Sequence, residues 1–164
     1  TIMPNMDLKE KIAVTKIYSI CDGEHEKGLI WTRPFRSPHH TISRIGLVGG
    51  GHQILPGEIS KAHNGILYLD EIGEFKNDAI EALREPMSSR KIHLTKSGKS
   101  LTYPANFMLV ATMNPCPCGN YLSKNENCTC SHQEIKKYMS KLSWPILDRI
   151  DMTIYMERVE TVFE

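Results

Sequence analysis

Two carboxylates follow directly on an apolar run in the stretch GILYLDEIGEF at positions 65–75. Four apolar residues precede Asp70 and Glu71, which is typical of a buried parallel strand reaching the edge of its sheet. The carboxyl ends of such strands are where α/β proteins place their chemistry. Asp70 in this position could hold Mg²⁺ through water, and Glu71 could orient an attacking water, as in nucleotide hydrolysis. The alternative is a strand whose acidic residues only mark its solvated end.

A second apolar run, FMLVATM at positions 107–113, ends in Asn114 and a proline. This pattern also predicts a buried strand that stops in a polar side chain. If the two strands are neighbours, Asn114 lies beside Asp70 and Glu71, and its amide could hold the attacking water or a phosphate oxygen. As an isolated residue before proline, Asn114 would be an ordinary turn residue.

Four of the five cysteines form two C-x-C pairs with nine residues between them: Cys116, Cys118, Cys128 and Cys130. In a reducing compartment such a cluster favours a metal over disulfides. Zn²⁺ takes four S or N ligands in a tetrahedron, although C-x₂₋₄-C is the more usual spacing. The pattern therefore makes these cysteines candidate zinc ligands, and reduced thiols in a surface loop are the alternative.

A basic hairpin is predicted by the sequence RKIHLTKSGKSLTY at positions 90–103. Lys96 and Lys99 flank its turn and could contact nucleic-acid phosphates, or they could simply keep the hairpin soluble. The GKS at positions 98–100 resembles the end of a phosphate-binding P-loop. That motif needs a glycine where His93 stands and a helix afterwards, so we reject it as a P-loop.

The elements that must position these residues follow from periodicity and caps. Helical spacing and a capping box that starts at Asp7 predict a helix over 7–21. The segment 31–40, WTRPFRSPHH, is expected to be an ordered loop, and the glycines at 49–51 a turn or hairpin tip. Further helices are predicted at 56–64, after Phe75 as far as position 87, and from Ser131 onward. Alternating strands and helices give an α/β fold with a parallel sheet flanked by helices.

Length and composition bound the remaining possibilities. The chain has 164 residues, 40% of them hydrophobic, which is enough for one domain or a piece of one. Its overall net charge of +1 does not indicate nucleic acid or another acidic partner, so any basic surface must be local. The sequence contains no run of membrane-spanning length and no export signal, so we expect no membrane partner and a cytoplasmic location. The start, Thr-Ile-Met-Pro, suggests an excised segment of a longer protein.

Several strings together resemble a known family. In order they are RPFRSPHH, VGGG, PGEISKAHNGILYLDE, ALREP, the basic hairpin, LVATMNPCPCG and LSWPILDRID. The chain is similar, over nearly its whole length, to the ComM family of magnesium-chelatase-like AAA+ ATPases. The resemblance implies a partial AAA+ P-loop NTPase core with a β-hairpin inserted before the motif called sensor 1.

The resemblance also implies roles for individual residues. Asp70 and Glu71 would form the Walker B motif, with Asp70 serving Mg²⁺ and Glu71 the water. Asn114 would be sensor 1. Arg149 would be an arginine finger that reaches the ATP of the neighbouring protomer in a ring. The hairpin at 90–103 would point towards the pore of that ring, and 49–56 would be the insert in helix 2.

Two family elements are expected outside residues 1–164, namely the Walker A loop upstream and the helical lid downstream. These residues are therefore expected to be a partial AAA+ core that neither binds nor hydrolyses ATP when isolated.

For the parent protein, the resemblance implies an ATP- and Mg²⁺-dependent homo-oligomeric ring, expected to be a hexamer, that remodels DNA. Helicase or branch-migration activity in recombination or natural transformation would be its role. One alternative is the ATPase motor subunit of a magnesium-chelatase-type metal insertion complex. Another is a non-catalytic zinc-binding interaction module.

Overall fold

The computed structural model describes residues 3–22, 28–123 and 126–156. Its helices are α1 (Leu8–Asp22), α2 (Arg44–Val48), α3 (Glu58–Lys61), α4 (Asn77–Glu81), α5 (Arg84–Ser89), α6 (His132–Met139) and α7 (Trp144–Leu147), with a 3-10 turn, η1 (Ile72–Glu74). Its strands are β1 (Phe35–Arg36), β2 (Gly49–Gly50), β3 (Leu55–Pro56), β4 (Ile66–Leu69), β5 (Lys91–Lys96), β6 (Lys99–Pro104) and β7 (Met108–Ala111). Within these described ranges, no helix is both long and apolar enough to cross a membrane.

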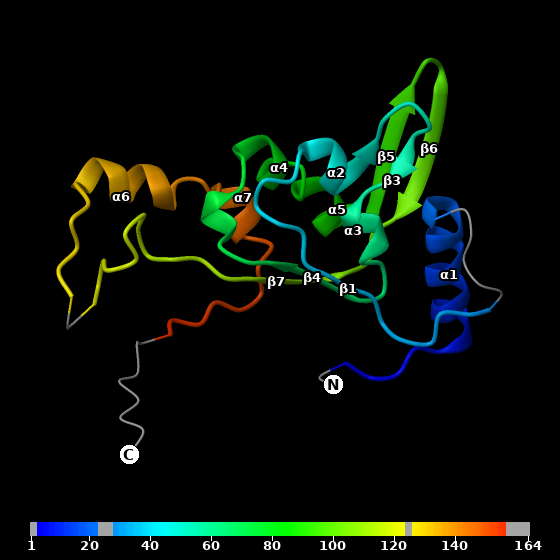
Figure 1. The fold of residues 1–164 in the computed structure, drawn as a ribbon, viewed down its shortest axis with the longest axis horizontal. Helices are drawn as coiled ribbons and strands as arrows, with labels where there is room; N and C mark the ends of the chain where they lie inside the picture. Colours follow the sequence, from blue (N-terminus) through cyan, green and yellow to red (C-terminus); the bar gives the residue numbers. More distant parts are fainter. Residues whose placement is uncertain (1–2, 23–27, 124–125, 157–164) are drawn as a thin grey trace.

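The centre of the fold is a parallel sheet of three strands in the order β1-β4-β7. Leu67 of β4 pairs with Leu109 of β7, and Leu69 pairs with Ala111, so the two strands end side by side. Helices α2 to α5 and α7 lie on one side of this sheet (Figure 1). The α/β fold with a parallel sheet and flanking helices that the sequence predicts is confirmed.

Alternation along the strands gives the sheet one buried face and one open face. On the helix-covered face, Leu67 and Leu69 have no exposed surface. On the other face Phe35 is 60% exposed and Met108 is 46% exposed, and Val110 is exposed beside them. A parallel sheet is normally covered on both faces. The apolar open face is therefore a surface that the described residues leave uncovered.

The hydrophobic core lies between the sheet and the helices above it. Its fully buried members come from both layers and from η1: Leu47, Ile59, Ala62, Leu67, Leu69, Ile72, Phe75, Ala79, Ile80, Leu83, Ile92, Ala105 and Ile146. Interiors are close-packed, so truncating a large member such as Leu67 to alanine typically costs about 2–5 kcal/mol. The core therefore fixes η1 and the end of β4 relative to the helices.

Helix α1 begins with the capping box that the sequence predicts. The Asp7 carboxylate accepts a hydrogen bond from the Glu10 N–H at 2.8 Å, and the Glu10 carboxylate accepts one from the Asp7 N–H at 2.9 Å. This reciprocal pair satisfies two N–H groups that the first turn leaves free. Val14 and Ile17 are buried, and they attach one face of the helix to the protein.

Two antiparallel hairpins lie next to each other at the far end of the molecule. In the β5–β6 hairpin, Ser97 and Gly98 both have positive φ, at 49° and 77°. Such a pair is typical of the tight turns that join twisted strands. Two hydrogen bonds join this hairpin to β2–β3: the Tyr103 hydroxyl donates to the Ile54 carbonyl at 2.7 Å, and Lys96 Nζ donates to the Gly51 carbonyl at 3.1 Å.

Three sequence-based expectations about regular elements were wrong. The run at 107–113 contains β7, but this strand is not buried as expected, because Met108 and Val110 are exposed on the open face of the sheet. The segment 31–40 is not entirely loop, because β1 lies inside it and pairs with β4. The helix expected after Phe75 is two short helices, α4 and α5. Pro86 explains the break, because proline has no N–H and is tolerated only in a first turn. A new helix starting at Arg84 puts Pro86 in that turn.

Candidate functional site at the carboxyl end of the sheet

Parallel pairing brings the carboxyl ends of β4 and β7 together. The ladder continues past the strands, because the Thr112 N–H donates to the Leu69 carbonyl at 3.1 Å and the Ile72 N–H donates to the Thr112 carbonyl at 2.8 Å. Asp70 and Glu71 therefore leave β4 directly opposite Thr112, with Asn114 two residues further on. The three polar residues predicted at this edge lie beside one another.

The Asp70 carboxylate is held by two hydroxyl groups. Its Oδ1 accepts hydrogen bonds from Thr112 Oγ1 at 2.6 Å and from the Tyr68 hydroxyl at 2.9 Å. Both bonds lower the pKa of Asp70, and the bond from Thr112 has the larger effect. The hydrogen bond to Asp70 raises the pKa of Tyr68. Among the described residues, no hydrogen bond reaches Oδ2. Asp70 therefore presents an ionised carboxylate with one oxygen free, which is the ligand type that Mg²⁺ prefers.

Glu71 has an unusual backbone conformation that turns the chain at the edge of the sheet. Its φ of 49° and ψ of 54° are in the left-handed region, which a residue with a side chain seldom adopts. The Glu71 N–H donates to Thr112 Oγ1 at 2.9 Å, and one carboxylate oxygen accepts a hydrogen bond from Asn114 Nδ2 at 3.3 Å. Outliers of this kind concentrate at functional sites.

Thr112 connects Asp70 with Glu71, and no sequence pattern predicted it. Its hydroxyl accepts a hydrogen bond from the Glu71 N–H and donates one to Asp70, so the hydroxyl serves as both acceptor and donor. The only signal in the sequence is its place at the end of an apolar run, opposite the acidic pair once the register is known. Threonine at a strand end has no motif of its own.

Arg149 lies apart from these residues. Its Nε donates to Ser88 Oγ on α5 at 2.5 Å, and its NH1 donates to the Pro145 carbonyl. It lines an open cleft of about 610 Å³ between α2, α5 and β5, together with Arg44 and His93. Within the described residues it makes no hydrogen bond to Asp70, Glu71 or Asn114. In the part of the chain that the structure describes, Arg149 is therefore not a member of the carboxyl-end group.

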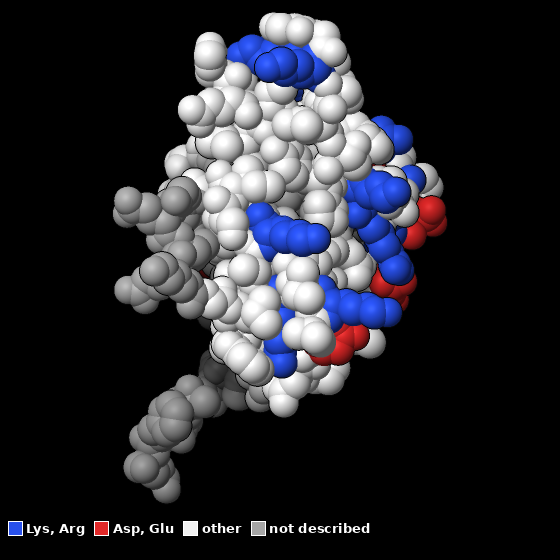
Figure 2. Space-filling model, turned by 90° about the vertical axis from the view of Figure 1, so that its right-hand side faces the viewer, with Lys and Arg blue, Asp and Glu red and all other residues white. Residues whose placement is uncertain are grey.

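Lys96 and Lys99 occupy the turn end of the β5–β6 hairpin, and both are exposed. The GKS at 98–100 spans the end of this turn and the start of β6, not the start of a helix. Figure 2 views the face that carries α1 and the hairpin. Lysine and arginine side chains are spread over this face from the hairpin tip downwards, and the fewer acidic side chains lie mainly in its lower right part.

The four clustered cysteines converge on one point. All four Sγ atoms lie within 4.8 Å of one another, and Cys116 is fully buried. Backbone N–H groups of Asn120 and Thr129 face the Cys118 sulfur and lower the pKa of that thiol to about 5. Thiolates are the form in which cysteines bind metal, so the cluster has the donor set for a metal ion.

Fold and site together define an α/β protein whose parallel sheet and flanking helices are consistent with a partial AAA+ core. The chain matches the family described as "Magnesium chelatase, subunit ChlI" over residues 1–162, and it belongs to that family.

Individual relatives agree with this assignment. The chain is 43% identical over 153 residues to the uncharacterized protein YifB of Escherichia coli, and 41% identical over 153 residues to the competence protein ComM of Haemophilus influenzae. Each match covers 93% of this chain and 30% of the relative, so the chain spans less than a third of their length. A shorter match, 35% identical over 69 residues, covers 42% of this chain and 11% of the magnesium-chelatase 67 kDa subunit of Chlorobaculum parvum.

Proposed function

We propose that the carboxyl end of the sheet is the hydrolytic half of an ATPase site in an AAA+ ring motor. The observation that carries the proposal is that Asp70 and the Glu71 N–H meet at the Thr112 hydroxyl, while the Asn114 amide donates to the Glu71 carboxylate. Family membership supports it, because the chain belongs to the family of the magnesium-chelatase subunit ChlI and resembles the AAA+ ATPases related to it.

Each residue has a role that its geometry supports. Asp70, ionised and with one free oxygen, would hold a water on Mg²⁺. When bound with ATP, the ion would neutralise part of the negative charge of the phosphates. Glu71 would orient the attacking water, and the Asn114 amide, already in contact with Glu71, would fix that carboxylate. Catalysis of this type depends on positioning and charge, which a fixed edge of a sheet provides.

We further propose that residues 1–164 are part of a larger AAA+ core. The open apolar face of the sheet supports this, because parallel sheets are stable when both faces are covered. The sequence contains no G-x-x-x-x-G-K-[ST] motif, so the phosphate-binding loop would come from elsewhere in the polypeptide. Residues 1–164 alone are then expected to bind MgATP poorly. The cytoplasm, a reducing compartment, suits the four clustered free cysteines.

Replacing Glu71 by glutamine in the full-length protein tests the ATPase proposal. Losing the group that orients water should lower kcat by about 10²- to 10⁴-fold while ATP binding is retained. The matched control is Asp78→Asn, which removes an exposed carboxylate on α4, close in the sequence but outside the site. Turnover and nucleotide affinity would be measured on both variants. Unchanged turnover in Glu71→Gln would contradict the proposal.

The ring is tested through Arg149, which we propose acts on the neighbouring protomer's nucleotide. Its guanidinium lies in an open cleft away from its own chain's carboxyl-end group, which suits a contact made between subunits. Arg149→Ala should lower turnover in the assembled ring by about 10³- to 10⁵-fold, with ATP binding largely intact. Arg44→Ala, a change in the same cleft, is the control. A ring that forms and turns over normally without Arg149 would make this residue structural.

We propose DNA as the substrate of the motor, because exposed lysines at the hairpin tip suit phosphate contacts and the Haemophilus relative is named for competence. DNA should stimulate the ATPase, and the double change Lys96→Gln with Lys99→Gln should remove that stimulation. The same changes at Lys136 and Lys137, on α6, are the control.

The second candidate is a motor for metal insertion, favoured by the match to a magnesium-chelatase subunit. ATPase activity that is not stimulated by DNA but is stimulated by a chelatase partner subunit would support this candidate instead.

A further inference from the structure

We propose that Cys116, Cys118, Cys128 and Cys130 bind one structural Zn²⁺ ion, and that this ion fixes both Asn114 and helix α6 against the carboxyl-end site. The zinc site is inferred from the cysteine geometry alone. The coupling of the ion to Asn114 and α6 is inferred from structural contacts, and only its effect on catalysis rests on the proposed function.

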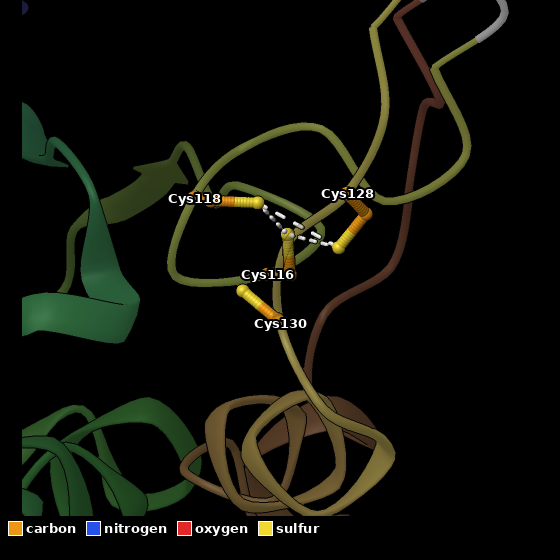
Figure 3. A group of neighbouring side chains, drawn as sticks. All are labelled: Cys116, Cys118, Cys128 and Cys130. Atoms are coloured by element: carbon orange, nitrogen blue, oxygen red, sulfur yellow. Dashed lines mark hydrogen bonds between the residues drawn. The ribbon is translucent and has the colours of Figure 1, made fainter.

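The sulfur positions fit a tetrahedral metal centre. The measured Sγ–Sγ distances are 3.3 Å for Cys116–Cys118, 3.7 Å for Cys116–Cys128 and 3.6 Å for Cys118–Cys128 (Figure 3). With Zn–S bonds of about 2.3 Å, a tetrahedron places its ligands about 3.8 Å apart. A disulfide would need about 2.05 Å. These three distances are therefore those of sulfurs sharing one ion. The Cys130 Sγ lies within 4.8 Å of the other three, and Figure 3 shows all four side chains pointing into one space.

The backbone around the cluster is shaped to face the sulfurs. The Tyr121 N–H donates to Cys116 Sγ at 3.3 Å, and the Gly119 N–H donates to the Cys116 carbonyl at 3.0 Å. Gly119 has a φ of +82°, a conformation that favours glycine and lets the chain turn tightly after Cys118. Hydrogen bonds from the backbone to thiolate sulfur orient metal ligands in the way that outer contacts do at metal sites.

One end of the cysteine loop leads directly to the carboxyl-end site. Cys116 follows Asn114 by two residues and is fully buried. Asn114 donates to Glu71, so an anchored Cys116 limits how far that amide can move. The hydrogen bond is long, at 3.3 Å, and no regular element holds Asn114 in place. An ion bound at Cys116 would supply that restraint.

The other end of the loop leads to α6, which presses on the residues after Glu71. Helix α6 begins at His132, two residues beyond Cys130, with a capping box at Ser131. Its Tyr138 packs so closely on Gly73 of η1 that a Cβ there would lie 2.6 Å from the ring. Lys141, just past α6, donates to the Gly73 carbonyl. An ion shared by residues 116–130 would therefore fasten both flanks of the site.

The test begins with metal content. The full-length protein, purified without a polyhistidine tag, should contain one zinc per chain by elemental analysis. Replacement by Co²⁺ should give the absorption spectrum of tetrahedral thiolate coordination. Cys130→Ser should lose the metal, Cys128→His should keep it because imidazole is also a zinc ligand, and Cys21→Ser, outside the cluster, should be unaffected. Substoichiometric zinc, or a cobalt spectrum without thiolate bands, would overturn the site.

The coupling is read by hydrogen–deuterium exchange, which does not depend on activity. Amides at 70–74 and in α6 should exchange faster in Cys130→Ser than in wild type, and the thermal midpoint should fall by about 5 °C or more. If wild type binds zinc but Cys130→Ser shows unchanged exchange at 70–74, the coupling is wrong and the zinc site remains supported. If the protein has no ATPase activity, the proposed function fails, but metal content and exchange still decide this inference. If Cys130→Ser does not fold, the comparison of wild type with Cys128→His and with the chelated protein replaces it.

Discussion

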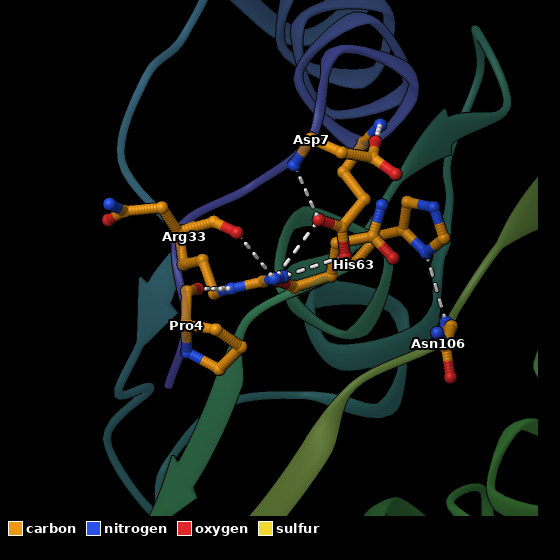
Figure 4. Close-up of polar contacts among 8 residues, drawn as sticks. Pro4, Asp7, Arg33, His63 and Asn106 are labelled. Carbon is orange, nitrogen blue, oxygen red and sulfur yellow. Dashed lines mark hydrogen bonds and ion pairs between the residues drawn. The ribbon is translucent and has the colours of Figure 1, made fainter. Parts of the chain in front are cut away.

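The two ends of the same three strands carry polar networks of opposite character. At the amino end, Arg33 lies just before β1 and uses its whole guanidinium within the protein (Figure 4). It donates to Glu10 Oε1 and Oε2 at 2.9 and 3.0 Å, and to the carbonyls of Pro4, Asn64 and Asn5 at 2.6, 2.7 and 3.4 Å. Arginine has five N–H donors, and all of them are used here.

The carboxyl end is the opposite, because its charged groups keep spare capacity. Asp70 engages one oxygen, and Glu71 receives one long hydrogen bond from a neighbouring amide. Both residues are exposed, whereas the Arg33 side chain is 15% exposed. A charged group whose partners are all internal stabilises the fold, and one with free lone pairs at the surface can bind a ligand. The amino end of the sheet therefore stabilises the fold, and the carboxyl end has the free groups that a chemical reaction needs.

The largest effect that would test this contrast is on stability, from Arg33→Met. The change leaves Glu10 and three carbonyls without their donor while keeping most of the apolar stem. We expect the free energy of unfolding to fall by about 2–4 kcal/mol, below the value for a fully buried pair because Glu10 is partly solvated. Urea unfolding measures it, and kcat of the folded fraction should be unchanged.

Arg84→Met is the matched control for that experiment. Arg84 pairs with Glu81 at 3.2 Å, but its side chain is 48% exposed. Exposed pairs contribute about 0–1 kcal/mol. If Arg33→Met were no more destabilising than Arg84→Met, or lowered kcat directly, the assignment of the amino end to stability would be wrong.

The next effect in size is on rate, from Thr112→Val at the carboxyl end. The change removes the hydroxyl that donates to Asp70 and accepts from the Glu71 N–H, so the pKa of Asp70 should rise towards its usual value. Because displacement of a positioned catalytic group can cost about 100-fold in rate, kcat of the full-length ATPase should fall by about 10- to 100-fold. Stability should change by less than about 0.5 kcal/mol, because Thr112 is exposed.

Thr112→Ser keeps the hydroxyl and should restore most of the rate. The acid limb of the pH–rate profile should lie at higher pH in Thr112→Val than in wild type. A variant that loses stability and keeps its rate would reverse the roles of the two ends.

Sequence reasoning anticipated the parts of this contrast that local patterns encode. The apolar runs before Asp70 and Asn114 predicted β4 and β7, and alternation about a Ser-Gly turn predicted the β5–β6 hairpin. The capping box at Asp7 predicted the start of α1. Each of these signals depends on residues close together in the chain, where propensity and capping are decisive.

What sequence reasoning missed depends on contacts between distant segments. Strand β1 has two residues between prolines, so only its pairing with β4 makes it a strand. Thr112 becomes part of the site only when β7 takes its register beside β4. The five bonds of Arg33 likewise reach Glu10 and Asn64, which are 23 and 31 positions away. No local pattern specifies such partners.

The smallest effect predicted is a pH dependence of stability that arises from His63 at the amino end. His63 is buried, and its Nδ1 accepts a hydrogen bond at 3.1 Å from the N–H of Asn106, two residues before β7 (Figure 4). Burial lowers the pKa of His63, and the charge of Glu10 opposes this only in part. Protonation would also remove the acceptor that Asn106 needs.

Because the pKa of His63 is lower in the folded protein, the unfolded chain binds more protons once the pH falls below about 6.5, the ordinary histidine value. The stabilisation is complete above that pH and is lost as the pH falls towards the folded pKa. Urea unfolding between about pH 7.5 and 5 should show the loss in wild type and a flatter dependence in His63→Gln. His52→Gln, an exposed histidine in the β2–β3 turn, should follow wild type. If stability depended on pH in the same way in wild type and His63→Gln, the amino end would tolerate a charge at this position. Only Arg33 would then support the view that the amino end is a structural network.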